Sequence, residues 1–230
     1  MNENPLIPNT QADKNLGLPE ADTNISVPLD KQGLEWHSRG YLPHRDRIHL
    51  LQSITFRLAD SLPQTVLQQL EAEIRLLPKT HQNIAKRKSI EQWLDAGMGC
   101  CALRNAEAAA YVQKSLLHFD GDRYHVIAWV VMPNHVHVLI EPVHPIAKIV
   151  QGWKSFTARW LLAQNEQLGL EIPDPHHVWM REYWDRFIRD DAHLRATIDY
   201  IHRNPVSRGL CPRAIDWKWS SARYYLLDPP

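Results

Sequence analysis

The stretch DRYHVIAWVVMPNHVHVLIEP, residues 122–142, decides the fold. It contains two runs rich in β-branched residues, 124–131 and 135–140, and the short segment Met-Pro-Asn separates them. Two such runs around a short break are typical of a β-hairpin. The stretch therefore predicts a pair of antiparallel strands near the middle of the chain.

The segments on either side of this hairpin alternate between strand and helix patterns. Residues 48–60 predict a strand with Ile54, Phe56 and Leu58 on one face, and residues 178–188 predict another strand. Apolar residues at helical spacing predict five helices, at 62–77, 84–97, 106–121, 145–166 and 190–204. The last helix is expected to stop before Pro205, because the residue before a proline disfavours the helical conformation. This order predicts an α+β fold, with helices on one face of an antiparallel sheet.

The composition is that of an ordinary globular protein. Hydrophobic residues make up 44% of the 230 residues and charged residues 23%, and the formal net charge is zero. We expect a disordered N-terminal tail over residues 1–33, which are rich in Asn, Asp and Pro, and a single domain over 34–230. A C-terminal tail is expected from about residue 212. The net charge neither supports nor excludes a nucleic-acid partner, since a neutral protein can carry a local basic groove.

The cysteines and the N-terminus indicate where the protein works. Cys100, Cys101 and Cys211 have no regular spacing, which argues against a disulfide framework and against a four-cysteine zinc site. The first residues have neither the basic region nor the apolar region of a signal peptide, and no apolar run approaches the roughly 20 residues of a membrane helix. We therefore expect a cytoplasmic protein with no membrane contact.

Two histidines two positions apart, His135 and His137, stand in the second strand of the hairpin. Side chains at positions i and i+2 of a strand point the same way, about 6.6 Å apart along the chain, so the two imidazoles could share one metal ion. Val136 and Val138 would face the core. In a chain with 13 histidines, such a pair is equally compatible with two polar residues on a strand surface.

A second pair of residues, Tyr200 and Asn204, stands in the last expected helix. Residues four apart lie on one helical face, so the two side chains project together. Asn204 offers a carbonyl oxygen as a third ligand beside two imidazoles. The alternative is a half-buried packing tyrosine and an asparagine that ends the helix.

Together these four residues form a chemical unit. Two imidazoles and an oxygen leave open positions on a divalent ion, which can polarise a phosphodiester. A phenol with a pKa of about 10 is a poor nucleophile at neutral pH and benefits from a nearby cation. Attack by Tyr200 at phosphorus would give a covalent phosphotyrosine, which conserves the bond energy so that the strand can be rejoined to another end.

Five longer strings stand in order along the chain: RGYLPHRD, ITFRLADSLP, YHVIAWVVMPNHVHVLIEP, VWMREYWDRFIRDDAHLRATIDYIHRNPVSRGL and WKWSSARYY. Together they resemble one family, the REP-associated tyrosine transposases. These belong to the single-tyrosine branch of the HUH (His-hydrophobe-His) transposases and nucleases. The resemblance extends from about Trp36 to Tyr225, and residues 79–100 fit least well, so we treat them as a possible helical insertion.

The resemblance implies a ferredoxin-like sandwich of the HUH endonuclease type. By position, His135 and His137 match the metal-binding pair, Tyr200 the nucleophile and Asn204 the third ligand, where some relatives carry Gln. The family implies Mg²⁺ or Mn²⁺, although such sites also bind Zn²⁺ or Ni²⁺. It implies as substrate single-stranded DNA hairpins, namely repetitive extragenic palindromes with a tetranucleotide at the foot. The chain could act as a monomer, or as a homodimer in which one tyrosine helix serves the partner's histidines.

Two groups of residues are candidates for contact with DNA. Arg39, Tyr41, His44 and Arg45 precede the first strand and could reach the foot of a hairpin. Lys148, Lys154 and Arg159 share a predicted helix with two tryptophans, which permits phosphate contact together with base stacking. The alternative for the second group is an amphipathic helix with a solvated basic face.

Three other functions stay open at this point. A DNA-binding protein descended from such an enzyme would bind hairpins without cutting them. A zinc-dependent hydrolase would use His135, His137 and another histidine, with Tyr200 as an electrophile. A structural or interaction module would carry the two histidines as surface residues and would show no particular affinity for metal.

Overall fold

The structure of the chain is a computed structural model. It describes residues 35–38, 43–46, 49–62, 64–76, 78, 82, 85, 89–90, 93–94 and 97–225. The expected disordered tail at residues 1–33 lies outside the described residues, as does most of the expected helix at 84–97. Among the described residues, no helix is long and apolar enough to cross a membrane.

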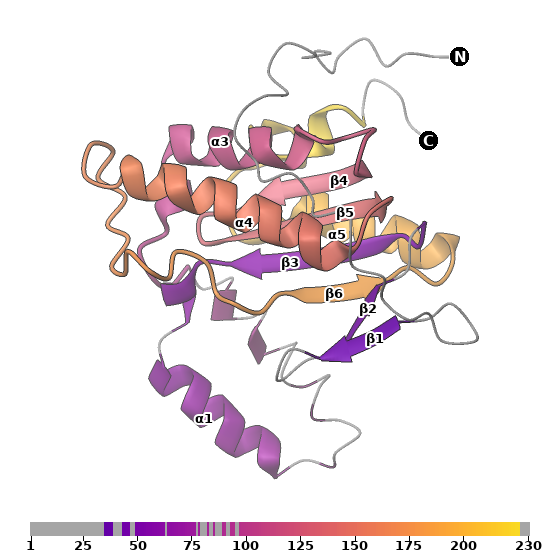
Figure 1. Ribbon diagram of the computed structural model, residues 1–230, viewed down its shortest axis with the longest axis horizontal. Coiled ribbons are helices and arrows are strands. Elements are labelled where there is room, and N and C mark those ends of the chain that lie inside the picture. The colour runs from indigo at the N-terminus through magenta and orange to yellow at the C-terminus, as the bar shows by residue number, and fades with distance from the viewer. Residues whose placement is uncertain are drawn as a thin grey trace, which may run out of the picture.

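A four-stranded antiparallel sheet forms the centre of the fold, in the order β4-β5-β3-β6 (Figure 1). The expected hairpin is present as β4 (Tyr124–Val131) and β5 (His135–Pro142). The first expected strand is β3 (Gln52–Arg57), and it pairs with β5 on one side and with β6 (Trp184–Phe187) on the other. A separate two-stranded sheet, β1 (Glu35–Ser38) with β2 (Pro43–Asp46), was not expected.

Two helices cover one face of the sheet, as expected. They are α3 (Ala106–Leu117) and α4 (Ile146–Ala163). Asn105 caps α3, because its side chain accepts hydrogen bonds from the backbone N–H groups of the first turn. Alternate residues of β3 and β5, among them Ile54, Phe56 and Val138, point toward these helices and form the main core.

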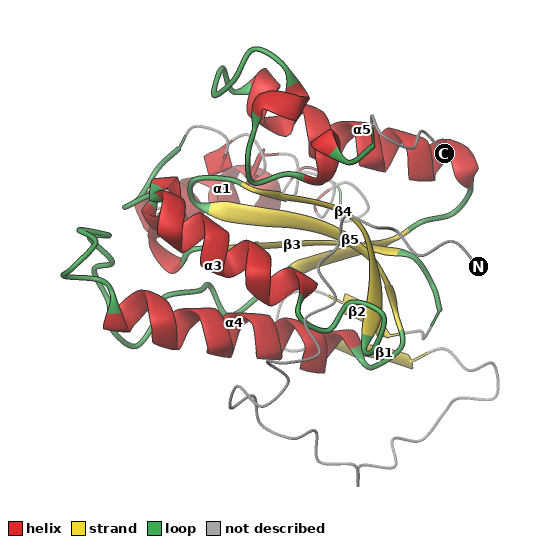
Figure 2. Cartoon of the chain, turned by 90° about the horizontal axis from the view of Figure 1, so that it is seen from above, coloured by secondary structure: helices red, strands yellow, loops and turns green. Residues whose placement is uncertain are grey.

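The last helix, α5 (Asp191–Ser207), lies on the opposite face of the sheet (Figure 2). The expected α+β fold with an antiparallel sheet is confirmed, but the helices do not all share one face. The reason lies in β4 and β5, whose outer-face residues Val130 and Leu139 are also apolar and fully buried. A sheet that is apolar on both faces needs cover on both, and Ile201 of α5 supplies part of it.

Several boundaries differ from those expected, and two of these differences concern α5 and the strand β6. The helix α5 continues through Pro205 to Ser207; Asn204 and Pro205 are buried, so packing in the last turn outweighs the lost N–H donor. The strand expected at 178–188 is shorter, since only Trp184–Phe187 pairs with β3 as a strand. Before it, Trp179 forms an isolated bridge with Leu58.

A smaller apolar cluster joins α1 (Gln64–Arg75) to the segment that we expected to be an insertion. Leu70 and Ile74 of α1 pack there with Ile90 and Leu94, and Trp184 of β6 packs against the same cluster. The described residues 89–90 and 93–94 are helical. This segment therefore contributes a satellite core beside the sheet.

Residues 217–225, which we expected within a C-terminal tail, pack along the free edge of β4. The backbone N–H of Val131 donates to the Trp219 carbonyl at 2.8 Å, and the Tyr225 hydroxyl donates to the Ile127 carbonyl at 2.6 Å. An uncovered edge strand would expose unpaired backbone groups, so this segment protects the sheet. Within the described ranges, four short 3-10 helices are also present, at Ala59–Ser61, Ala102–Arg104, Ala214–Asp216 and Ser221–Arg223.

One buried hydroxyl, that of Ser221, fastens the C-terminal segment to both the sheet and α5. It accepts a hydrogen bond from the Trp129 backbone N–H at 2.9 Å and lies 2.8 Å from His202 Nε2. We expect Ser221→Ala to lower the free energy of unfolding by about 1–3 kcal/mol, since it leaves buried polar groups without a partner. Urea denaturation measures this. The matched control is Ser155→Ala on the exposed face of α4, which should change stability by no more than about 0.5 kcal/mol; equal effects would contradict the fastening role.

Candidate active site

The two histidines of β5 point toward the face that α5 covers. Val136 and Val138 point toward α3 and α4, so the alternation of the strand places His135 and His137 on the other side. Both are almost fully buried, with 1% and 2% of their surface exposed. Their Nε2 atoms lie 3.0 Å apart, so the two rings converge on one point.

The other ring nitrogens, the Nδ1 atoms, are held by neighbouring side chains. Asn134 donates to the carbonyls of Leu94 and Met98, which leaves its Oδ1 as an acceptor 2.7 Å from His135 Nδ1. The Nδ1 of His135 must therefore carry the proton, and its Nε2 carries a lone pair. The Thr55 hydroxyl lies 2.8 Å from Nδ1 of His137 and can serve either tautomer of that ring. In one of them, both Nε2 lone pairs face the point of convergence.

Burial keeps His135 uncharged. Loss of solvent, and secondarily the nearby His137, lowers the pKa of His135 well below its ordinary value. A neutral imidazole is the form that binds a metal ion. The environment of His135 therefore favours a metal ligand over a surface cation.

Asn204 adds a third polar group at the same point. It is 4% exposed, its Nδ2 lies 3.4 Å from His137 Nε2, and its Oδ1 has no hydrogen-bond partner. The two amide atoms have nearly the same shape, so a half-turn of the amide brings the oxygen to the position of the nitrogen. A buried oxygen without a partner costs stability, and a cation at the point of convergence would satisfy it.

The donor set fits a divalent ion. Two nitrogens about 3 Å apart have the spacing of adjacent ligands on an octahedral ion with bonds of about 2.1 Å. Among the described residues, no group of three or more His, Cys, Asp or Glu side chains is placed to hold a metal. The best candidate in that part of the chain is thus the mixed set of His135, His137 and Asn204.

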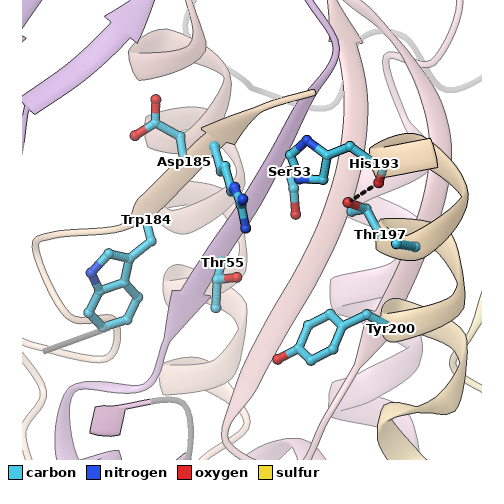
Figure 3. Close-up of a pocket in the computed structure, with 9 residues that line it drawn as sticks. Ser53, Thr55, Trp184, Asp185, His193, Thr197 and Tyr200 are labelled. Atoms are coloured by element: carbon cyan, nitrogen blue, oxygen red, sulfur yellow. Dashed lines mark hydrogen bonds between the residues drawn. The ribbon is translucent and has the colours of Figure 1, made fainter. Parts of the chain in front are cut away.

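Tyr200 lies beside this set and remains accessible. Its ring centroid is 5.3 Å from that of His137, and 42% of its surface is exposed. It extends from α5 toward Thr55 of β3, at one side of an open pocket (Figure 3). Eight further residues from β3, β6 and α5 line this pocket, namely Ser53, Thr55, Trp184, Asp185, Arg186, His193, Ala196 and Thr197. The pocket offers a tyrosine hydroxyl to a substrate that enters from solvent.

The basic residues expected on the helix after the hairpin lie far from this pocket in the fold. Lys148, Lys154 and Arg159 belong to α4, which covers the other face of the sheet. The Lys154 ammonium donates to three backbone carbonyls at 3.0–3.3 Å, those of residues 180–182. Lys154 thus holds in place the segment that leads into β6. Lys148 and Arg159 are exposed.

The tryptophans of α4 belong to the packing of the domain. Trp153 is buried against Phe56 and donates to the Tyr124 hydroxyl at 2.9 Å. Trp160 stacks on Tyr111, with ring centroids 4.3 Å apart. The interpretation of these rings as stacking platforms for bases therefore finds no support.

The earlier basic group can be placed only in part. Arg39 and Tyr41 lie outside the described residues. The backbone of His44 and Arg45 forms part of β2, and their side chains are not among those described. The strand β2 lies next to β6, which lines the pocket of Tyr200.

Asn134 and Thr55 orient the two histidines, and the sequence did not single them out. Asn134 gave a weak signal, because it directly precedes His135 in the turn. Thr55 gave none, since its position opposite His137 follows from the register of β3 on β5. Such outer partners fix the tautomer and direction of metal-binding histidines.

Comparison with known proteins confirms the resemblance that the sequence indicated. Residues 108–204 match the family model described as Transposase IS200 like. The chain is 29% identical over 114 residues to a REP-associated tyrosine transposase of Escherichia coli (strain K12), covering 48% of this chain and 62% of that relative. A Haemophilus influenzae protein, provisionally described in the same way, is 29% identical over 103 residues, covering 43% and 58%. The matches thus span about three-fifths of the relatives' length.

A solved structure is also similar to the chain. It is that of a REP-associated tyrosine transposase bound to a REP hairpin, with 17% sequence identity and a TM-score of 0.47. The superposition covers 84% of this chain and 86% of that one.

The lowered pKa of a further buried histidine, His202, predicts how the stability of the fold depends on pH. Burial lowers its pKa from 6.5 to about 4. Between these two pH values His202 is protonated in the unfolded chain but stays neutral in the folded one. Stability is therefore full above pH 6.5 and falls as the pH drops toward 4, by up to about 3 kcal/mol from this group. We expect His202→Gln to show a shallower fall over this window in urea denaturation. The same slope in variant and wild type would contradict the assignment.

Proposed function

We propose that the protein is a metal-dependent endonuclease and strand transferase that cuts and rejoins single-stranded DNA through a covalent phosphotyrosine. One observation carries this proposal. A single chain brings the buried donors His135, His137 and Asn204 to one point, beside the accessible Tyr200. A packing tyrosine and two surface histidines would explain neither the burial of the donors nor the exposure of the phenol.

His135, His137 and Asn204 would hold the metal, for which we propose Mg²⁺ or Mn²⁺. Oxygen and imidazole ligands also suit Zn²⁺, so the ion that binds most tightly in vitro need not be the working one. When bound, the ion would polarise the phosphodiester and favour the ionised phenol. Asn134 and Thr55 keep the two rings aimed at it.

Tyr200 would act as the nucleophile. Its Oη attacks the scissile phosphorus and loses its proton, so that a bond forms between Oη and phosphorus. The bond from phosphorus to the leaving deoxyribose oxygen breaks, and that oxygen takes up a proton to become a free hydroxyl. The strand is rejoined when a hydroxyl of another end attacks the phosphotyrosine and releases Tyr200.

The substrate that we propose is a single-stranded hairpin of the repetitive extragenic palindrome type. The support is the similarity to REP-associated tyrosine transposases and the open pocket at Tyr200. A strand that enters this pocket from the side of β6 would pass β2, which carries His44 and Arg45. We therefore favour the group at residues 39–45 as the DNA contact, ahead of the basic residues of α4.

The arrangement supports cleavage by one chain acting alone. Tyr200 lies beside His137 of the same chain, and Ile201, the next residue of α5, is buried against the sheet. The tyrosine helix therefore need not come from a partner. We propose cleavage in cis, which permits a monomer as the working unit.

Tyr200→Phe should abolish the covalent adduct while leaving DNA binding in place. Tyr200 is the only group in this mechanism that bonds to phosphorus, and the substitution removes a single oxygen. The purified protein is incubated with a labelled single-stranded hairpin oligonucleotide and Mn²⁺, and a denaturing gel is run. We expect a protein-linked band for the wild type and none for the variant or with a chelator.

Tyr224→Phe is the matched control, because this tyrosine is also half-exposed but lies in the C-terminal segment. It should retain the adduct. Cleavage that survives Tyr200→Phe would replace the proposal with hydrolysis by an activated water. Binding of hairpins without adduct or cleavage by the wild type would favour a protein that binds DNA but no longer cuts it.

His137→Ala should weaken Mn²⁺ binding by at least about 10-fold, since it removes one of three ligands. Titration calorimetry with Mn²⁺ alone measures this without any DNA. The matched control is His125→Ala, which removes an exposed histidine of β4 and should bind as the wild type does. Equal affinities for wild type, variant and control would mean that His137 is not a ligand of the metal.

A further inference from the structure

Arg57 is a buried arginine on the same sheet face as the two histidines, and the mechanism above does not use it. Its neighbour across the β3–β5 ladder is His135, so the two side chains leave the sheet on the same side. On the β6 side, its guanidinium carbon lies 5.9 Å from the ring centroid of Trp184, a residue that lines the Tyr200 pocket. Only 2% of the surface of Arg57 is exposed.

The guanidinium uses only part of its capacity to donate hydrogen bonds. Within the described part of the chain, its one hydrogen bond runs from Nη1 to the Ser61 hydroxyl at 2.9 Å, and its buried Nε has no partner. The N–H groups of Nε and Nη2 form the opposite edge of the planar group. This edge is the fork with which arginine binds two oxygens of a carboxylate or a phosphate. The structure therefore contains an arginine fork whose Nε is buried and has no acceptor.

The positive charge of Arg57 has no counter-ion in direct contact with it among the residues that the structure describes. Burial lowers its pKa to about 10, partly offset by Asp60, so it stays charged at neutral pH. Among the described residues, no carboxylate lies within 4 Å of the guanidinium, and Asp60 instead accepts from the Cys100 backbone N–H at 2.6 Å. The proposed metal ligands are all neutral, so a metal ion bound by them would add a second positive charge near Arg57. A buried cation is tolerated when it is paired, which calls for an anion that arrives with the substrate.

We propose that Arg57 is a phosphate-binding residue, whose Nε–Nη2 edge grips one backbone phosphate of the single-stranded DNA beside the metal and Tyr200. The inference rests on the proposed function, since it takes the DNA strand as the source of the phosphate. Ser61 holds the guanidinium in place through Nη1, so the fork is oriented before the DNA binds. A carboxylate also presents two oxygens to such a fork, but it does not occur in a nucleic-acid strand.

The test measures DNA binding with cleavage prevented. All proteins carry Tyr200→Phe and are kept in chelator, so that binding is observed without an adduct. Labelled hairpin oligonucleotides taken from inverted repeats of the host genome are made with one neutral methylphosphonate at each successive position near the foot. Dissociation constants are compared for the Arg57 version, Arg57→Met, Arg57→Lys and the control Arg104→Met, an exposed arginine ahead of α3.

We expect one methylphosphonate position to weaken binding by the Arg57 protein on the order of 10- to 100-fold, as expected for loss of a charge-assisted pair. Arg57→Met should bind unmodified DNA more weakly by a similar factor and should be insensitive to that position. Arg57→Lys, which keeps the charge without the fork, should show an intermediate loss. Arg104→Met should respond to every position as the Arg57 protein does.

Several outcomes would overturn the proposal. Unchanged binding by Arg57→Met would mean that no phosphate contacts Arg57. The same would follow if the effects of the substitution and of the methylphosphonate were independent, so that their fold-losses in affinity multiplied at every position. If Arg57→Met fails to fold, the same comparison with Arg57→Lys decides, because full sensitivity of that variant at every position would exclude the fork. A parent protein that binds no hairpin DNA would instead overturn the proposed function together with this inference. If the parent binds hairpin DNA and the Arg57 variants bind it equally well, only the role of Arg57 is overturned.

Discussion

The pairing of β3 with β5 is the constraint on which the candidate site depends. Its register sets Thr55 opposite His137 and Arg57 opposite His135, on the face away from the main core. A shift by one residue would turn both histidines into the apolar core and bring Val136 and Val138 to the site. The same ladder thus fixes the fold and the chemistry, because the valines that bury one face force the histidines onto the other.

The helix α5 completes the site, and its position is secured from two directions. Ile201 is buried against the second face of the sheet, and His202 reaches Ser221 of the segment that covers the β4 edge. The candidate residues Tyr200 and Asn204 stand on either side of these two anchors. The helix can therefore present a half-exposed phenol and a buried amide without moving, which is what a preorganised site requires.

Much of the fold was predictable, and the errors have specific causes. The hairpin and the helices α1, α3 and α4 follow from periodicity, because apolar spacing reports directly on which residues are buried. The extent of α5 past Pro205 was not predictable, since the local preference against helix is overcome by packing in its last turn. The position of the basic residues of α4 relative to the Tyr200 pocket was not predictable, because periodicity gives the face of a helix but not the side of the sheet to which it docks.

The available chemistry can be read from the order of residues: two histidines on one strand face, and a tyrosine with an asparagine on one helix face. These follow from spacing along the chain, which local geometry converts into direction. The tertiary structure decided that the two pairs meet, that Asn134 and Thr55 aim the rings, and that a buried Arg57 stands beside them. Contacts between distant segments depend on strand register and helix docking, and those are set by the packing of the whole domain.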